Sequence, residues 1–137
     1  MPLTVDIIKR LQGFTLNVSF DAEAGVTALL GASGSGKSMT LRCIAGVERP
    51  DEGSIVLDGR VLYDSTAKID LPPQARKVGY LFQRYALFPS MTVQQNIEAG
   101  LSLERDAHIR KTKRESLVAR FHLQGLEHRL PRELSGG

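Results

Sequence analysis

Residues 31–38 constrain this chain more than any other stretch. They read GASGSGKS, which satisfies the pattern G-x-x-x-x-G-K-[ST] in full. Residues 26–30 before this loop are nearly all apolar, so they predict a strand that is buried on both faces. Residues 39–45 after it predict a helix. The order of strand, glycine loop and helix gathers backbone N–H groups and a helix N-terminus around one point, and such a point binds anions.

The residue types in the loop suit a bound polyphosphate. Gly31, Gly34 and Gly36 have no Cβ, so the backbone can approach phosphate oxygens closely. Lys37 supplies a mobile positive charge for the β- and γ-phosphates, and Ser38 supplies a hydroxyl that can ligate Mg²⁺. A chance match in a chain of this length has odds on the order of one in a hundred or less. We therefore favour phosphate binding over a flexible glycine-serine loop.

Composition limits the class of protein further. The 137 residues correspond to one domain or to part of one, with 42% hydrophobic and 24% charged residues, as in a soluble globular protein. A net charge of +3 suits an anionic nucleotide or membrane surface, or a solvated basic face. Cys43 has no second cysteine to pair with and is expected to be a small buried residue in a reducing compartment. With no signal peptide or transmembrane run, we expect a cytoplasmic protein.

Alternating apolar and polar residues predict antiparallel strands around the loop. This pattern holds over residues 3–7 and again over residues 14–20, so two half-buried strands are expected there. Residues 54–63 predict a hairpin, because Asp58 and Gly59 suit the two left-handed positions of a tight turn.

A second apolar run points to one further candidate site residue. The run covers residues 77–82 and predicts another strand, preceded by a loop over residues 64–75. Gln83 follows directly after it. Ligands of open α/β sheets lie beyond the carboxyl ends of the strands, so Gln83 either faces the same crevice as Lys37 or is a polar residue of a surface loop.

Two helices are predicted in the last third of the chain. Thr92 to Gln95 form a capping-box pattern that starts a helix over residues 93–99. A longer helix is expected over residues 107–122, and it carries a basic cluster formed by Arg110, Lys111, Lys113 and Arg114. The cluster indicates contact with phosphate or membrane, or a solvated face. No aromatic residues alternate with it, as a surface that stacks nucleic-acid bases would require.

Three motifs stand in a fixed order: residues 31–38, Gln83, and LSGG at residues 134–137. Together they resemble the Walker A motif, Q-loop and signature motif of the ATP-binding subunits of ATP-binding-cassette (ABC) transporters. A finer resemblance, to molybdate and sulfate importers, rests on residues 55–65, 71–83 and 85–89. The motif Q-x-x-x-L-F-P within these residues also resembles a motif of importers of sugars, polyamines and iron.

The resemblance implies an α/β fold, namely a P-loop NTPase core with an incomplete RecA-like parallel sheet, an N-terminal antiparallel β-subdomain and part of a helical subdomain. Residues 1–82 would form the β-subdomain and P-loop core, and residues 83–137 the Q-loop and helical subdomain. It implies a motor ATPase for uptake of a small anion such as molybdate or sulfate, located in the cytoplasm on the inner face of the membrane.

The resemblance also assigns roles to single residues. The residues that would hold the phosphates of ATP are Gly31, Ser33, Gly34, Ser35, Gly36, Lys37, Ser38 and Met39. Lys37 and Gln83 would be catalytic, and Ser38 and Gln83 would contact Mg²⁺. Phe14 is the candidate to stack on adenine. Met39 stands where the family commonly has threonine, a mild departure because Ser38 carries the Mg²⁺ contact.

Two partners are implied. Ser135 and Gly137 would complete the ATP site of a second copy in a head-to-tail homodimer, and the segment that begins at Arg84 and ends at Pro89 would contact a transmembrane permease. No nucleic acid is expected.

The family's catalytic Walker B carboxylates and switch histidine follow the signature motif and are not among the 137 residues. We therefore expect this chain to be the N-terminal part of a longer protein. By itself, this part is expected to bind nucleotide without hydrolysing it. The alternatives are a soluble ABC-type ATPase that acts on nucleic acid or ribosomes, and a non-catalytic interaction fragment.

Overall fold

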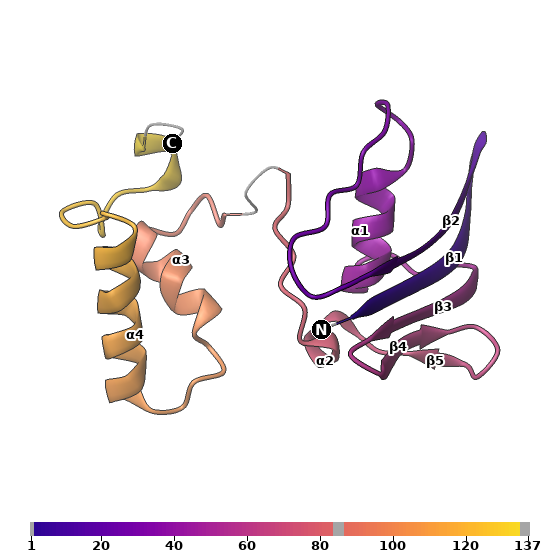
Figure 1. Cartoon of the computed structure of the whole chain (residues 1–137). Coiled ribbons are helices and arrows are strands. Elements are labelled where there is room, and N and C mark those ends of the chain that lie inside the picture. Colours follow the sequence, from indigo (N-terminus) through magenta and orange to yellow (C-terminus); the bar gives the residue numbers. More distant parts are fainter. Residues whose placement is uncertain (1, 84–86, 135–137) are drawn as a thin grey trace. The chain divides into compact units, whose positions relative to one another are not determined.

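The computed structural model describes residues 2–83 and 87–134, and these form two compact units that meet in the sequence between Tyr80 and Leu81 (Figure 1). The elements of the described residues are β1 (Leu3–Leu11), β2 (Phe14–Ala22), α1 (Lys37–Ala45), β3 (Glu52–Leu57), β4 (Arg60–Asp64), β5 (Ile69–Asp70), α2 (Pro73–Arg76), α3 (Val93–Gly100), α4 (Ala107–Arg120) and the 3₁₀ turn η1 (Pro131–Glu133). None of the described helices is both long and apolar enough to cross a membrane.

The first unit contains an antiparallel sheet. Within the described residues its five strands follow the order β2-β1-β3-β4-β5. The predicted strand pair before the loop and the predicted hairpin are both confirmed: Val5 of β1 lies opposite Phe20 of β2 on one side and Ile55 of β3 on the other. The hairpin turn has Asp58 at φ 53° and Gly59 at φ 74°, as the sequence predicts.

The core of this unit lies between α1 and the sheet (Figure 1). The fully buried side chains of this cluster are Val5, Ile7, Cys43, Ile44, Ile55, Leu62 and Tyr63. They come from β1, α1, β3 and β4, so burial of these apolar groups fixes the helix on the sheet. Burial also raises the pKa of the Cys43 thiol to about 11, which keeps it neutral inside the core.

Two predicted strands are wrong. Residues 26–30, expected to be buried on both faces, form no strand, and Val26 and Leu30 are fully exposed. Residues 77–82 form no strand either, and Leu81 is exposed. An apolar run becomes a buried strand only where other strands and a covering layer lie beside it, and the sheet of the described residues consists of β1 to β5 alone.

The predicted loop over residues 64–75 is more ordered than expected. It contains β5, whose two residues pair with Tyr63 and Asp64 of β4, and the first residues of α2, which begins at Pro73. A two-residue strand shows no periodicity, so the sequence pattern could not reveal it. Proline at the first helical position is favourable, which explains why α2 starts there.

The second unit contains the two predicted helices. The capping box of α3 is confirmed: the backbone N–H of Gln95 donates to Thr92 Oγ1 at 3.3 Å, and the N–H of Thr92 donates to Gln95 Oε1 at 2.8 Å. α4 ends at Arg120, two residues before the predicted end, because His122 adopts a left-handed φ of 54°. Val93 and Val118 are buried where these helices contact each other.

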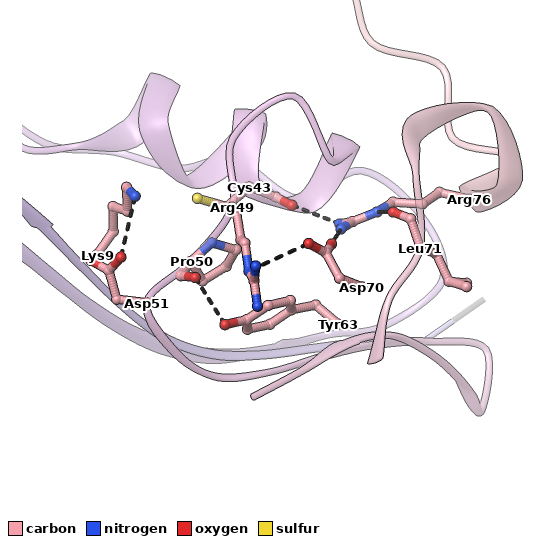
Figure 2. Close-up of polar contacts among 9 residues, drawn as sticks. All are labelled: Lys9, Cys43, Arg49, Pro50, Asp51, Tyr63, Asp70, Leu71 and Arg76. Atoms are coloured by element: carbon pink, nitrogen blue, oxygen red, sulfur yellow. Dashed lines mark hydrogen bonds and ion pairs between the residues drawn. The ribbon is translucent and has the colours of Figure 1, made fainter. Parts of the chain in front are cut away.

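A carboxylate joins the end of β1 to the segment before β3 and makes stability depend on pH. Asp51 Oδ2 accepts the backbone N–H of Arg10 at 2.6 Å. Lys9 Nζ donates to Asp51 Oδ1 at 3.3 Å (Figure 2). These contacts, the first above all, hold the pKa of Asp51 below its usual value. A lowered pKa stabilises the fold above about pH 4, and this contribution is lost as the pH falls through the pKa of the folded state.

We expect Asp51→Asn to unfold at lower urea concentration than wild type at pH 7, and the difference between the two proteins to be smaller at pH 3. The amide that replaces the Asp51 carboxylate lacks the negative charge that strengthens the hydrogen bonds from Lys9 and from the N–H of Arg10. In the wild type, protonation of Asp51 at low pH removes the same charge. Urea unfolding followed by circular dichroism at the two pH values measures this. A difference between the proteins that persists unchanged at pH 3 would contradict it.

Candidate phosphate-binding site

The first turn of α1 presents three backbone amides without a protein acceptor. Gly36 is the N-cap in the left-handed conformation, at φ 91°. The first helical bond runs from the N–H of Thr40 to the carbonyl of Gly36, at 2.8 Å. The preceding N–H groups belong to Lys37, Ser38 and Met39, and within the described residues no carbonyl or side chain accepts a hydrogen bond from them. The helix therefore begins at Lys37, two residues before the predicted start.

In the helices α3 and α4, acceptors within the protein bind N–H groups of the first turn. In α3, the N–H groups of Val93 and Gln94 donate to carbonyls of the segment before η1, at 2.9 Å each. In α4, Asp106 Oδ1 accepts the N–H groups of His108 and Ile109, at 2.8 and 3.2 Å. By contrast, α1 has no side-chain cap and no acidic residue in its first turn. Its positive helix end is therefore available to an external anion.

Lys37 adds a full positive charge at the same place. Its Nζ donates to the carbonyls of Gly31 and Ala32, at 2.7 Å each, and to Ser35 Oγ at 3.3 Å. Among the described residues no carboxylate forms an ion pair with it. The ammonium and the helix end therefore attract anions together, and no protein charge neutralises either of them.

The remaining loop residues surround this point. Ser33, Gly34, Ser35 and Ser38 are exposed, so their hydroxyls and backbone are accessible to a ligand. Gly34 has a φ of 83°, a conformation that favours glycine. The side chain of Met39 instead packs against the core, which leaves only its backbone N–H for the site. The structure thus brings all of the predicted loop residues together.

Phe14 lies beside the loop. A Cβ placed on Gly36 would be 3.4 Å from Phe14 Cε1 and 2.6 Å from Leu16 Cδ1, so Gly36 packs directly on the start of β2. The Phe14 side chain remains 40% exposed. Its ring is therefore placed next to the phosphate-binding loop with an accessible surface, and its stacking on adenine stays a prediction.

Other predicted residues are not brought to the loop by the described structure. Gln83 is exposed and belongs to the second unit, whereas Lys37 belongs to the first, so their shared crevice stays a prediction. Ser135, Gly137 and Arg84 lie outside the described residues. Within the described part of the chain, no group of three or more histidine, cysteine or acidic residues could hold a metal ion.

The part of the predicted permease segment that the structure describes, residues 87–89, contains an anchored apolar pair. Leu87 and Phe88 are half-exposed. Asn96 of α3 holds the backbone behind them: its Oδ1 accepts the N–H of Phe88 at 2.9 Å, and its Nδ2 donates to the carbonyls of Phe88, Met91 and Thr92 at 3.0–3.2 Å. An exposed apolar pair on a fixed backbone suits contact with another protein.

Three of the four cations of the basic cluster on α4 are paired with acidic residues. Lys113 lies 2.9 Å from Glu104, Lys111 lies 3.9 Å from Glu115, and Arg114 pairs with Glu98. Hydrogen bonds from Gln94 and Arg114 lower the pKa of Glu98, and the hydrogen bond from Lys113 lowers that of Glu104. Of the two interpretations of this cluster, the structure favours the solvated, ion-paired face.

Sequence reasoning missed two residues that hold α1. Thr40 is 2% exposed, and its Oγ1 donates to the carbonyl of Gly36 at 3.1 Å, which fixes the N-cap from inside the helix. Arg76 is 1% exposed and contacts the other end of α1. The sequence feature that could have indicated this bond is a threonine four positions after Gly36, close enough along a helix for its hydroxyl to reach the Gly36 carbonyl. Nothing in the local sequence indicates that Arg76 is buried, because its partners lie up to 33 positions away.

The sequence profile described as ABC transporter matches residues 15–137. Among curated proteins, the molybdenum import ATP-binding protein ModC of Paramagnetospirillum magneticum is 47% identical over 135 residues, which cover 98% of this chain and 37% of that protein. The spermidine/putrescine import ATP-binding protein PotA of Nitrosospira multiformis is 44% identical over 136 residues, covering 96% of this chain and 36% of that protein. The chain thus spans just over a third of the length of these relatives.

A solved structure has the same fold. The dimeric ABC transporter cassette MJ0796 matches with a TM-score of 0.75 at 24% identity, and the match covers 99% of this chain and 64% of that one. This likeness confirms the predicted fold class, an α/β cassette with an antiparallel N-terminal sheet. The profile match over most of the sequence confirms the resemblance that the motifs indicate: the chain belongs to the ABC transporter family.

Proposed function

We propose that this chain binds ATP at residues 31–39 and forms the ATP-binding part of an ABC importer. The observation that carries the proposal is the first turn of α1, where three unpartnered amides and the ammonium of Lys37 meet with no carboxylate among them. This arrangement suits a polyphosphate, because the amides can donate hydrogen bonds to its oxygens while Lys37 neutralises the β- and γ-phosphates. Phe14, beside Gly36, would stack on the adenine ring.

Magnesium fits this site as a partner of the bound phosphates. Ser38 is exposed in the first turn of α1, and its hydroxyl would provide one oxygen ligand, while water and phosphate oxygens complete the coordination. Gln83 would provide another oxygen. When bound, the ion would neutralise charge on the phosphates and polarise them for transfer.

Hydrolysis requires a group that orients the attacking water. The first turn of α1 contains no acidic residue. We therefore propose that residues 31–39 bind the nucleotide and that its hydrolysis depends on Gln83 together with carboxylates supplied from outside these 137 residues.

The proposed partners follow from the family, from a solved structure of the same fold and from one exposed surface. A second copy would contribute Ser135 and Gly137 across a head-to-tail dimer, and MJ0796, which shares the fold, is a dimeric cassette. A membrane permease would dock on the segment from Arg84 to Pro89, in which Leu87 and Phe88 are half-exposed. The protein would then lie in the cytoplasm, on the inner face of the membrane.

For the transported substrate we propose a small oxyanion such as molybdate or sulfate, supported by the relatives named as molybdenum importers. The 44% identity to a polyamine importer lies between the 47% and 42% identities to two molybdenum importers, so identity in this stretch does not separate the substrate classes. The alternative, an ATPase acting on nucleic acid, gains little support from α4, because three of the four cations of its basic cluster are paired with Glu98, Glu104 and Glu115.

Calorimetric titration tests the proposal with ATP, pyrophosphate and AMP, each in the presence of Mg²⁺. We expect ATP to bind, pyrophosphate to compete with it, and AMP to bind at least about tenfold more weakly, because AMP lacks the phosphates that the loop contacts. Equal affinities for ATP and AMP, or no competition by pyrophosphate, would show that the loop is not the binding site.

A further inference from the structure

A buried cation lies at the C-terminal end of α1, opposite the phosphate-binding turn. The guanidinium of Arg76 uses all three of its nitrogens: Nη1 donates to the carbonyls of Cys43 and Ile44 at 2.8 and 3.0 Å, Nε donates to the carbonyl of Leu71 at 2.7 Å, and Nη2 contacts Asp70 Oδ1 at 3.0 Å. Figure 2 shows this group between α1 and the segment that follows β5. One side chain therefore joins the end of α1 to residues 70–71.

The two helix carbonyls that Arg76 binds are among the last ones of α1, which no intrahelical N–H satisfies. They also form the negative end of the helix, where a cation is stabilising. Gly46 makes room for it: a Cβ at this position would lie 2.6 Å from Arg76 Nε. Gly46 itself closes the helix at φ 79°, and its N–H bonds back to the last turn. Arg76 and Gly46 thus fix this end of the helix together.

The same short helix carries the phosphate-binding amides at its other end. Its nine residues span about 14 Å, so α1 moves as one rigid body, and a tilt at Ile44 displaces the amides of Lys37 and Ser38. Charge screening reaches about 8 Å at physiological salt. An influence of Arg76 on a phosphate bound at the first turn is therefore carried by the position of the helix more than by direct attraction.

The polar contacts hold Arg76 in one geometry. Asp70 is 37% exposed and also lies 3.5 Å from Arg49 Nε, but Arg49 is largely exposed, so that pair contributes little. The contacts of Arg76 to the helix carbonyls are buried, and those to Leu71 and Asp70 are partly buried. Together they need a planar guanidinium, which a lysine cannot replace because it offers a single nitrogen.

We propose that Arg76 is a positioning residue for the phosphate-binding loop. By holding the C-terminal carbonyls of α1 against the segment after β5, it sets the direction in which the amides of Lys37, Ser38 and Met39 point. This inference rests on the proposed function of residues 31–39, and it adds a residue that lies outside the loop and touches no ligand.

Arg76→Lys and Arg60→Lys form a matched pair for the test. Arg60 also donates to a backbone carbonyl, that of Ala75 in α2 at 2.7 Å, but it is exposed and has no contact to α1. The probe is Mg²⁺-pyrophosphate, which contains only the groups that the loop binds. Its affinity is measured by calorimetry well below the melting temperature, beside the ¹⁵N–¹H resonances of residues 37–39 and the free energy of unfolding.

We expect Arg76→Lys to raise the Kd for pyrophosphate about tenfold and to shift the three amide resonances, while Arg60→Lys stays within about twofold of wild type. A folded Arg76→Lys with wild-type affinity and unshifted amides, whatever its stability, would overturn the inference and leave Arg76 a purely structural residue. If Arg76→Lys does not fold, Asp70→Asn replaces it, with an expected rise of about threefold; unchanged affinity there would overturn the inference equally.

Lys37→Ala separates this inference from the proposed function. If Lys37→Ala binds pyrophosphate as well as wild type does, the loop is not the site and the proposed function fails. If Lys37→Ala loses affinity and Arg76→Lys does not, the proposed function stands and only the positioning role is wrong.

Discussion

Lys37→Ala is expected to raise the Kd for Mg²⁺-ATP about 30-fold, because a charge-assisted hydrogen bond to phosphate contributes about 2 kcal/mol. Stability should change by less than about 0.5 kcal/mol, since the carbonyls of Gly31 and Ala32 that Lys37 contacts are exposed and regain water. Calorimetry gives the affinity, and urea unfolding gives the stability.

Lys111→Ala is the control for net charge. Lys111 lies on the exposed face of α4, where it pairs loosely with Glu115 at 3.9 Å. Both variants lower the net charge by one, so a general electrostatic effect would weaken ATP binding equally in the two. Equal losses would therefore rule out a specific contact from Lys37, and affinity lost only in Lys37→Ala would support one.

Gly53→Ala should destabilise the first unit by about 3 kcal/mol or more. Gly53 lies in β3 opposite Ile7 of β1, and it has a φ of 99°. A Cβ there would be 1.9 Å from the backbone carbonyl oxygen of Asp6, so β1 would have to move away from β3. Strain at a left-handed alanine adds to that cost. Urea unfolding monitored by circular dichroism measures the loss.

Gly59→Ala is the matched control. Gly59 has a similarly positive φ of 74°, but a Cβ there would have no heavy atom within 4 Å. Gly59→Ala should therefore lower the free energy of unfolding only by the cost of a left-handed alanine, about 1 kcal/mol. Equal destabilisation by the two variants would mean that β1 moves away from Gly53 at little cost, which the close packing of this sheet argues against.

The parts of the fold that the sequence predicts well are those that local chemistry determines. Alternation specifies β1 and β2, Asp58 and Gly59 specify the hairpin turn, and the capping box at Thr92 starts α3, because each device acts between residues that are close in sequence. The phosphate-binding residues of the loop are predicted by the same kind of local pattern, because their spacing alone brings the backbone amides and the Lys37 ammonium to one point.

What failed depends on contacts distant in sequence. Residues 26–30 have the composition of a buried strand, yet a strand also needs neighbouring strands, and composition cannot show whether these are present. Arg76 resembles any surface arginine in the sequence, and only the folded chain shows that its partners include Cys43 and Ile44. The sequence likewise gives no sign of the role of Gly53, because its close approach to Asp6 exists only once β1 and β3 are paired.

The hydrogen bonds of Asn96 affect how the second unit can associate with another protein. Association normally costs free energy because flexible backbone becomes ordered in the interface. Here the backbone from Phe88 to Thr92 is already held by one amide side chain, which bonds to groups in that segment at both of its ends. Loss of conformational entropy at this surface is thus largely complete before any encounter, so the half-exposed ring of Phe88 can contribute most of its apolar area directly to affinity.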